Sequence, residues 1–335
     1  MKIGVFGAEQ WDKSFFPKAL KSDKLSITNK SLDEDSVKDF KDIEIACVFV
    51  GSKVTAKVIK SLPKLKFIAT RSTGFDHVDL KAASKRKIKV ANVPFYGENT
   101  VAEHAFALLL NLSKNVHKSY IKTLADDYSW DGLMGFDLKG KTLGVLGAGH
   151  IGMHLIRMAR GFGMNVLAYD LFRNDFLADI LSFEYSDDIE YVLKRADIVS
   201  LHMPSLSSTK HIINKKRISL MKRGAIIINT ARGDLIDTNA LYAALKSGHL
   251  GGAGLDVIEG EDLIKEEPEK LNKESRARLR LLHKDHKIFH LPNVVFTPHI
   301  AFFSKEALER IMQTTVDNIA AFKAGKDSGN EVSAK

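Results

Sequence analysis

The chain has 335 residues, of which 44% are hydrophobic and only seven are prolines, so it is long enough for two domains and disorder is not expected. No apolar run approaches the roughly 18 residues of a membrane span, which excludes an integral membrane protein and favours a soluble, cytoplasmic one. The net charge of +9 comes from lysines scattered among acidic residues, which indicates a solvated surface rather than a nucleic-acid site.

Short runs rich in Val and Ile alternate with segments of helical period, which is typical of βαβ units and predicts an α/β fold with parallel sheets. The expected strands form two series. The first series comprises residues 2–6, 45–50, 67–70 and 89–92, and the second comprises 142–146, 165–169, 198–201, 225–229, 252–255 and 294–297. The only cysteine, Cys47, lies in one of these apolar runs, so we expect a buried, unreactive thiol.

Helical patterns flank the second series of strands. Residues 100–112 are apolar on nearly every side and begin with an apparent capping box of Thr100 and Glu103, which predicts a buried helix. A buried helix between two sheet-forming halves suits a domain junction, so we place the first boundary near Asn99. A closing amphipathic helix is expected at 304–322, and the polar tail at 325–335 is expected to be a frayed end.

A glycine motif follows the first strand of the second series. Residues 147–152 have the pattern G-x-G-x-x-G and open a predicted helix, so backbone amides at a helix N-terminus would face a pyrophosphate. Gly147 would allow the tight turn, Gly149 the approach of the phosphates and Gly152 the helix-to-strand contact. Asp170 ends the next strand, where a carboxylate accepts hydrogen bonds from the adenosine ribose, so NAD is favoured over NADP.

Three further segments carry groups suited to acid–base chemistry. Arg232, in Asn-Thr-Ala-Arg-Gly, follows the apolar strand 225–229 and emerges where an open α/β sheet binds its ligands. Its planar guanidinium fits a carboxylate in a bidentate way. Asp-Val-Ile-Glu-Gly-Glu at 256–261 and Thr-Pro-His at 297–299 complete the pattern.

With these motifs, the sequence from residue 1 to about 322 resembles the D-isomer-specific 2-hydroxyacid dehydrogenases, and most of all their D-lactate dehydrogenase branch. The resemblance implies that Arg232 binds the substrate carboxylate, that His299 exchanges the proton, and that Glu261 holds this histidine. The chemistry needs such a set, because hydride transfer to a keto carbon requires a proton donor in the same step and imidazole suits that task near neutrality. A neighbouring carboxylate stabilises imidazolium, and an arginine stabilises the developing oxyanion.

The same resemblance extends to residues that would hold the cofactor and the substrate. The expected cofactor is NAD, and no metal is expected. The cofactor residues are Gly147, Gly149, His150, Ile151, Gly152, Asp170, Met203, Pro204, Thr209, Thr230, Ala231, Arg232 and Asp256. The substrate residues are Thr73, Gly74, Tyr96, Arg232 and His299. Asp256 is assigned to cofactor orientation, with a strand-end turn former as the alternative. Other histidines near motifs, His104, His150, His154 and His202, are expected to be helix or loop residues rather than acids.

The family implies two Rossmann-like doubly wound parallel-sheet domains with the active site in the cleft between them. We expect a discontinuous substrate domain, residues 1–98 and 300–335, and an NAD-binding domain, residues 99–299, through which a homodimer forms. The family also implies that the domains close on the substrate by a hinge motion and exclude water.

The expected reaction is reduction of pyruvate to D-lactate. The lactate assignment depends on Tyr96 and on a long, basic insert within residues 262–290, whose contacts the sequence does not indicate. Other 2-keto acids, namely 2-ketoisocaproate, glyoxylate and hydroxypyruvate, would use the same three catalytic residues. A dinucleotide-sensing transcriptional corepressor also shares this fold, but such proteins carry a long low-complexity extension that this sequence lacks.

Overall fold

The computed structural model describes residues 1–261 and 285–334, and most of the basic insert expected at 262–290 lies outside the described residues. Two compact units make up the chain. The first unit comprises Met1–Tyr96 and Ser304–Lys335, and the second comprises Gly97–Phe303. None of the helices in the described residues has the length and apolar character that a bilayer span requires.

The first unit contains a six-stranded sheet in the order β13-β5-β4-β3-β1-β2. All of its neighbouring strands are parallel except β13, which is antiparallel to β5. Without β13 the order is 2-1-3-4-5, the flavodoxin-like doubly wound order. Its elements are β1 (Lys2–Val5), α1 (Gln10–Ala19), β2 (Lys24–Ile27), η1 (Ser36–Phe40), β3 (Ile45–Val48), α2 (Ala56–Ser61), β4 (Phe67–Thr70), α3 (Leu80–Lys85), β5 (Lys89–Ala91), α13 (Lys305–Lys323) and β13 (Glu331–Val332).

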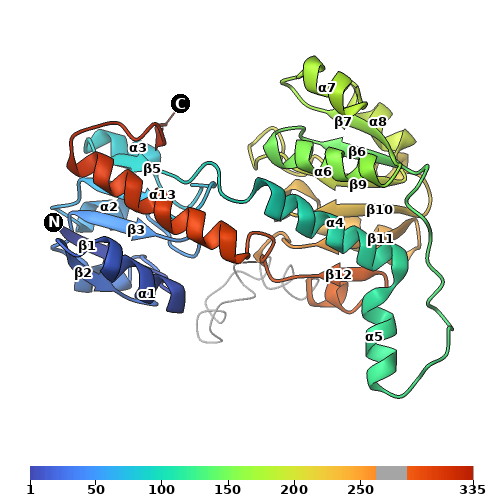
Figure 1. Cartoon of the computed structure of the whole chain (residues 1–335), viewed down its shortest axis with the longest axis horizontal. Coiled ribbons are helices and arrows are strands. Elements are labelled where there is room, and N and C mark those ends of the chain that lie inside the picture. The colour runs from blue at the N-terminus through green and yellow to red at the C-terminus, as the bar shows by residue number, and fades with distance from the viewer. Residues whose placement is uncertain (262–284, 335) are drawn as a thin grey trace. The chain divides into compact units, whose positions relative to one another are not determined.

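Helices cover both faces of this sheet, which explains why its central strands are continuously apolar. In β3, Ile45 and Cys47 pack with the side of the sheet that α1 and α13 cover, while Ala46 and Val48 pack with the side that α2 covers. Figure 1 shows α13 running across its face of the sheet. Cys47 is buried as expected, and this burial raises the pKa of its thiol to about 12, which disfavours the reactive thiolate.

The second unit contains a seven-stranded, all-parallel sheet in the order β12-β11-β10-β9-β6-β7-β8. The order reverses between β6 and β9, which is the switch point where doubly wound sheets bind ligands. Its elements are α4 (Glu98–Lys114), α5 (Val116–Leu124), β6 (Thr142–Leu146), α6 (His150–Gly161), β7 (Asn165–Tyr169), α7 (Asp175–Leu181), β8 (Glu184–Tyr185), α8 (Ile189–Arg195), β9 (Ile198–Leu201), α9 (Lys215–Leu220), β10 (Ala225–Asn229), η2 (Gly233–Leu235), α10 (Thr238–Lys246), β11 (Leu250–Leu255) and β12 (Val294–Phe296).

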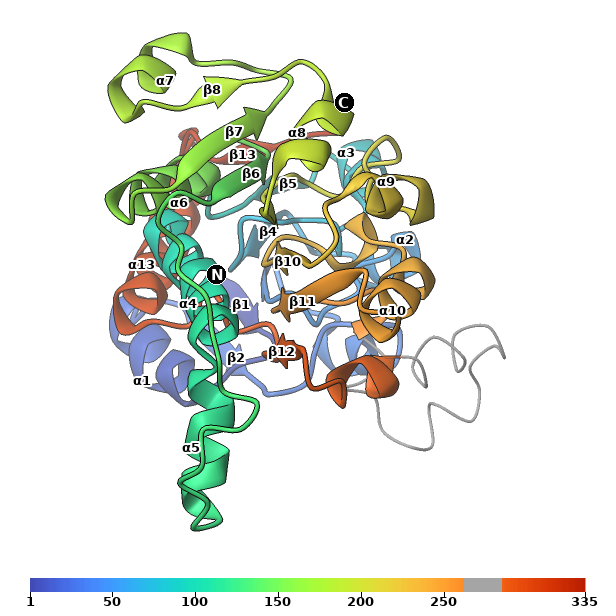
Figure 2. The ribbon, with the colours of Figure 1, turned by 90° about the vertical axis from the view of Figure 1, so that its right-hand side faces the viewer.

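Two apolar layers enclose this second sheet. Helices α4 and α6 pack on one face, and α8, α9 and α10 pack on the other, as Figure 2 shows. The two doubly wound parallel-sheet units confirm the predicted fold class. The arrangement leaves the carboxyl ends of the parallel strands, and the segments that follow them, available for a binding site.

Two local predictions were wrong. Helix α4 begins at Glu98 after an N-cap at Gly97, so Thr100 lies buried inside the first turn and forms no capping box. The tail expected to fray contains β13, which pairs with the outer edge of β5. Lys89 and Glu331 bridge these two strands with a 2.8 Å ion pair. An open sheet edge offers unpaired backbone groups, and a polar segment can satisfy them as well as an apolar one.

Candidate active site

Predicted site residues follow five of the parallel strands of the second unit. Gly147 follows β6, Asp170 follows β7, Met203 lies beyond β9, Thr230 follows β10, and Asp256 follows β11. Parallel strands have their carboxyl ends at the same edge of the sheet, so these residues share one edge. This edge includes the switch point between β6 and β9.

The three glycines after β6 have different structural roles. Gly147 has φ of +97°, and a Cβ there would lie 2.7 Å from the carbonyl oxygen of His202. A Cβ on Gly152 would lie 2.2 Å from the Gly147 oxygen, so both positions require glycine. A Cβ on Gly149 would meet nothing within 4 Å, so open space lies at the start of α6. Space beside a helix N-terminus fits the pyrophosphate of a dinucleotide.

Asp170 is fixed beside this glycine loop. Its Oδ2 accepts a 2.7 Å hydrogen bond from the N–H of Ala148, and its Oδ1 accepts one of 2.9 Å from Phe172. Arg173, the nearby cation, pairs instead with Asp175 at 3.1 Å and with Asp187 at 3.2 Å. The local charge therefore fits a ribose with free hydroxyls better than a 2′-phosphate.

The segment after β9 is held by its own side chains. The Thr209 hydroxyl donates to the carbonyl of Pro204 at 2.7 Å and accepts from the N–H of Leu206 at 2.8 Å. Met203, just before this turn, is buried. Desolvation lowers the pKa of His202 to about 4, so this histidine stays neutral near pH 7, and its Nε2 lies 2.8 Å from the hydroxyl of Ser200.

The turn after β10 presents Arg232. Asn229 locks it, because its Oδ1 accepts from the N–H of Ala231 at 3.0 Å and its Nδ2 donates to the carbonyl of Arg232 at 2.8 Å. The hydroxyl of Thr230 is buried without a hydrogen-bond partner in the part of the chain that the structure describes. A buried hydroxyl normally has a partner, so this atom fits a site that a cofactor completes.

His299 and Glu261 come together although 38 residues separate them. Nδ1 of His299 lies 2.9 Å from Oε1 of Glu261, and both side chains are partly exposed. Because an ionised carboxylate can only accept, Nδ1 carries the hydrogen in this pair. Nε2 is then the ring nitrogen that can exchange a proton with a ligand.

Asp256 anchors the segment that carries His299. Its Oδ1 accepts from the Thr297 hydroxyl at 2.5 Å and from the N–H of Ile300 at 2.9 Å, and its Oδ2 accepts from Ala301 at 2.8 Å. Burial would raise the pKa of Asp256, but the nearby His104 side chain and hydrogen bonds from Thr297, Ile300 and Ala301 hold it below its ordinary value. These contacts are those of the alternative role as a turn former, and the role in cofactor orientation stays a prediction.

The expected substrate residues Thr73, Gly74 and Tyr96 belong to the first unit. Thr73 lies in a turn where its hydroxyl donates to the carbonyl of Val93 at 2.9 Å. Within the described residues, the backbone N–H groups of Thr73 and Gly74 have no backbone carbonyl partner, as a carboxylate-binding loop requires. The carbonyl of Tyr96 accepts a 2.6 Å hydrogen bond from Arg310.

Comparisons with known proteins give the family. Residues 106–301 match the family model of the D-isomer specific 2-hydroxyacid dehydrogenase, NAD binding domain. The chain belongs to this family. It is 38% identical to 2-hydroxyacid dehydrogenase homolog 2 of Schizosaccharomyces pombe, over 96% of both chains. It is 36% identical to D-lactate dehydrogenase of Escherichia coli, over 99% of this chain and 100% of the other.

Solved structures agree with this assignment. The crystal structure of D-lactate dehydrogenase from Aquifex aeolicus, complexed with NAD and lactic acid, matches with a TM-score of 0.90 at 36% identity, over 99% of both chains. The protein is therefore an NAD-dependent D-2-hydroxyacid dehydrogenase, and the matched residues place its NAD-binding domain within the second unit.

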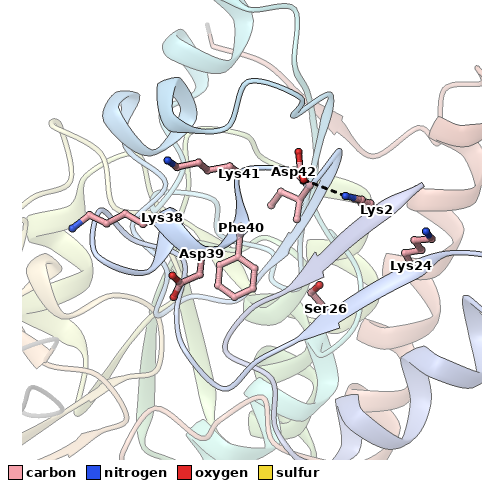
Figure 3. Close-up of a pocket in the computed structure, with 9 residues that line it drawn as sticks. Lys2, Lys24, Ser26, Lys38, Asp39, Phe40, Lys41 and Asp42 are labelled. Atoms are coloured by element: carbon pink, nitrogen blue, oxygen red, sulfur yellow. Dashed lines mark hydrogen bonds and ion pairs between the residues drawn. The ribbon is translucent and has the colours of Figure 1, made fainter.

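One cavity of this dehydrogenase contains none of the predicted site residues. It has a volume of about 360 Å³ and is lined in the first unit by residues of β1, β2 and η1 and by the segment that follows (Figure 3). Four lysines and two aspartates are among the residues that line it, and one lysine, Lys2, pairs with Asp42 at 3.3 Å. We assign it no part in the candidate active site.

Sequence reasoning missed three residues that shape the site of this dehydrogenase. Asn229 and Thr297 lie inside motifs that were recognised, so each was visible as a polar residue at a strand end. His104 was set aside as a helix residue, although its Nε2 lies 2.9 Å from the hydroxyl of Thr297. No pattern in the sequence connects α4 with a segment so distant along the chain.

Proposed function

We propose that this protein reduces a small 2-keto acid, pyruvate in preference, to the D-2-hydroxy acid with His299 as the proton donor. The observation that carries the proposal is the 2.9 Å pair between His299 and Glu261. NADH, when bound, supplies the hydride that reaches the keto carbon. The proton of the new hydroxyl comes from Nε2 of His299, because Glu261 occupies Nδ1.

Each of the three residues has a separate task in this proposal. Glu261 stabilises the imidazolium form of His299 and keeps its ring in one orientation. Arg232 binds the substrate carboxylate and places fixed positive charge where negative charge develops on the keto oxygen. Asn229 fixes the turn that presents Arg232, so this charge needs little reorganisation during the reaction. In the oxidative direction His299 accepts the proton.

The cofactor would be held by groups already described. The open space at Gly149 and the start of α6 suit the pyrophosphate, and Asp170 suits the ribose hydroxyls. The buried hydroxyl of Thr230 offers one further polar contact. His150, Ile151, Pro204, Thr209 and Ala231 stay predictions as neighbours of the cofactor.

Pyruvate is the proposed substrate because two of the similar proteins are named D-lactate dehydrogenase and because Tyr96 matches a substrate-facing tyrosine of lactate enzymes. Thr73 and Gly74 would contribute backbone N–H groups to its carboxylate. The alternatives 2-ketoisocaproate, glyoxylate and hydroxypyruvate require the same three catalytic residues and differ only in the side chain that must fit.

Steady-state oxidation of NADH with these four keto acids tests the proposal. We expect turnover with pyruvate to give the highest kcat/KM, and NADPH to be a poor substitute for NADH. His299→Ala should bind NADH normally in a fluorescence titration but lose about 10² to 10⁴-fold in kcat, the usual contribution of a general acid. Absence of turnover with every acid would refute the reaction, and an active His299→Ala variant would refute its proton donor.

We also propose a homodimer in the cytoplasm. Helix α5 and the segment after it project from the second unit as an arm (Figures 1 and 2). The side chains of this arm include several exposed apolar ones. The exposed apolar residues of this arm are Val116, Tyr120, Ile121, Leu124, Tyr128, Trp130 and Met134. Several exposed apolar side chains on one projecting segment are typical of an interface with another protein chain. The single, buried thiol at Cys47 is compatible with a reducing compartment.

A further inference from the structure

A second histidine contacts the anchor of the His299 segment from a different element. His104 lies in the second turn of α4, and its Nε2 is 2.9 Å from the hydroxyl oxygen of Thr297. The same nitrogen is 3.5 Å from Oδ1 of Asp256. His104 is partly buried, and Asp256 is fully buried. All of these residues belong to the second unit.

The direction of the hydrogen bonds follows from the charge on Asp256. Its pKa lies below the ordinary value, so it is ionised at neutral pH and its oxygens can only accept. The Thr297 hydroxyl must therefore donate its hydrogen to Oδ1, at 2.5 Å. The Thr297 hydroxyl has no second hydrogen to donate, so its oxygen can only accept a hydrogen bond from His104. Nε2 of His104 must therefore carry a hydrogen.

We call the hydrogen bonds from His104 to Thr297 and from Thr297 to Asp256 the His104 relay. The two last residues of this relay also contact the backbone of His299. The N–H of His299 donates to the carbonyls of Asp256 and Thr297, each at 2.9 Å. Both acceptors are backbone carbonyls of residues whose side chains take part in the relay. Asp256 also binds the N–H groups of Ile300 and Ala301, which follow the histidine. A change in the rotamer of Thr297 or Asp256 would shift the residues on both sides of His299.

We propose that His104 is a positioning residue that acts through Thr297 and Asp256 to orient His299 for proton transfer. The proposal rests on His299 being the proton donor of the reaction proposed above. His104 does not exchange a proton with the substrate. It supplies one N–H that fixes the Thr297 hydroxyl, and the loss of that donor frees the hydroxyl to turn away from Asp256.

Substitutions at His104 that differ only in reach test this role. In His104→Gln the amide nitrogen occupies about the place of Nε2, so the donor is kept. In His104→Asn the same amide is too short to reach Thr297. We expect His104→Gln to retain most of the wild-type kcat, and His104→Asn and His104→Leu to lose about 10- to 100-fold, the effect known for removing the hydrogen-bond partner that orients a metal-bound histidine. KM for NADH should stay unchanged in all three.

A double-substitution cycle and a control complete the kinetic test. Thr297→Val interrupts the same relay, so combining it with His104→Leu should add little further loss in kcat. His154→Leu, which removes a histidine of α6 that contacts Arg157, should behave as wild type. Equal kcat in wild type and His104→Asn, or equal losses in His104→Gln and His104→Asn, would overturn the proposal. An inactive wild type would instead refute the proposed function.

The hydrogen on Nε2 can be observed without measuring activity. Two-dimensional NMR of the protein with ¹⁵N-labelled histidine distinguishes the two neutral tautomers from their nitrogen shifts. The His104 signal is the one that disappears in His104→Gln. We expect the Nε2–H form, and an Nδ1–H form would overturn the relay even if His104→Leu is impaired.

Discussion

His299 adopts a backbone conformation that few residues other than glycine accept. Its φ is +59°, in the left-handed region, which costs roughly 1–2 kcal/mol for a residue with a Cβ. Its N–H donates to two carbonyls, and its ring pairs with Glu261, so backbone and side chain are fixed by different partners. Strain held in this way is typical of functional positions. The loss of Glu261 should therefore free the ring without releasing the backbone.

Asp285 is a buried carboxyl group in an unfavourable setting. Both of its oxygens lack hydrogen-bond partners in the described part of the chain. Burial and the charge of Glu259 raise the pKa of Asp285 to about 8, so it is protonated at neutral pH. Glu259 itself lies 2.8 Å from Nε2 of His211. The folded protein therefore loses stability as the pH rises from about 4 to 8, because the unfolded chain can ionise this carboxyl group in that interval and the folded chain cannot.

Asp285→Asn should therefore stabilise the protein, and increasingly so as the pH rises. The unfolded chain releases this proton near the ordinary pKa of 3.8 and the folded chain only near 8, so the wild type loses stability across that interval. The variant does not titrate. We expect similar stability near pH 4 and an advantage of the variant that grows steadily between pH 4 and pH 8, measured by urea unfolding at several pH values. A variant that is less stable than the wild type at pH 8 would contradict the prediction.

Local motifs could be predicted from the sequence, whereas contacts between distant segments could not. The glycine loop at 147–152 could be predicted because Gly147 and Gly152 are each required by backbone close to them in space, and Gly149 borders open space that a ligand can use. The pairing of Glu261 with His299 was available only through the family resemblance. The role of His104 could not be predicted, because its partner Thr297 lies 193 residues away and no sequence pattern links the two. The burial of Asp285 could not be predicted either, because a single buried carboxyl group forms no periodic pattern.

Strand prediction failed at three of the four sheet edges for a related reason, and only the apolar edge strand β12 was predicted. The central strands are buried on both faces and form continuous apolar runs, such as β10, which is buried throughout. The three strands that were missed, β2, β8 and β13, lie at edges and are at most partly buried. An edge strand needs only backbone pairing on one side, so its side chains follow no apolar pattern.

The segments that follow β10 and β11 pack against each other without room for a side chain. A Cβ on Gly233 would lie 2.1 Å from the carbonyl carbon of Ile258 and 2.4 Å from the nitrogen of Glu259. These atoms are backbone, so they cannot move aside as a side chain can. Gly233 therefore allows the turn of Arg232 to approach the segment that ends at Glu261.

Gly233→Ala should separate these two segments. We expect a loss of about 1–3 kcal/mol in stability, as for other overpacked sites, and at least a tenfold loss in kcat/KM because Arg232 and Glu261 move relative to each other. Thermal unfolding and steady-state kinetics would measure the two effects. Gly161→Ala is the matched control, since a Cβ there meets nothing within 4 Å. Wild-type kinetics in Gly233→Ala would show that the packing can relax.

The arm formed by helix α5 and the segment after it exposes several large apolar side chains, which is unfavourable for a monomer in water. Leu124 is 69% exposed, Trp130 is 88% exposed and Met134 is 94% exposed. Helix α5 has no buried residue, whereas each of the longer helices α4, α6 and α13 has several. A helix without a buried face gains little from its own domain, so its order in solution depends on a further surface that covers it.

We expect that surface to belong to a second copy of the chain. Sedimentation velocity at micromolar concentration should give a dimer for the wild type and a monomer for the double variant Ile121→Glu and Leu124→Glu, because each new charge would have to be buried without a partner. Phe176→Glu changes a similarly exposed residue, 74% accessible, on α7 and should leave the dimer intact. A monomeric wild type would refute the proposal, as would a dimer that tolerates both charges. Since α5 directly follows α4, loss of the dimer should also loosen α4, detectable as faster amide exchange near its C-terminal end.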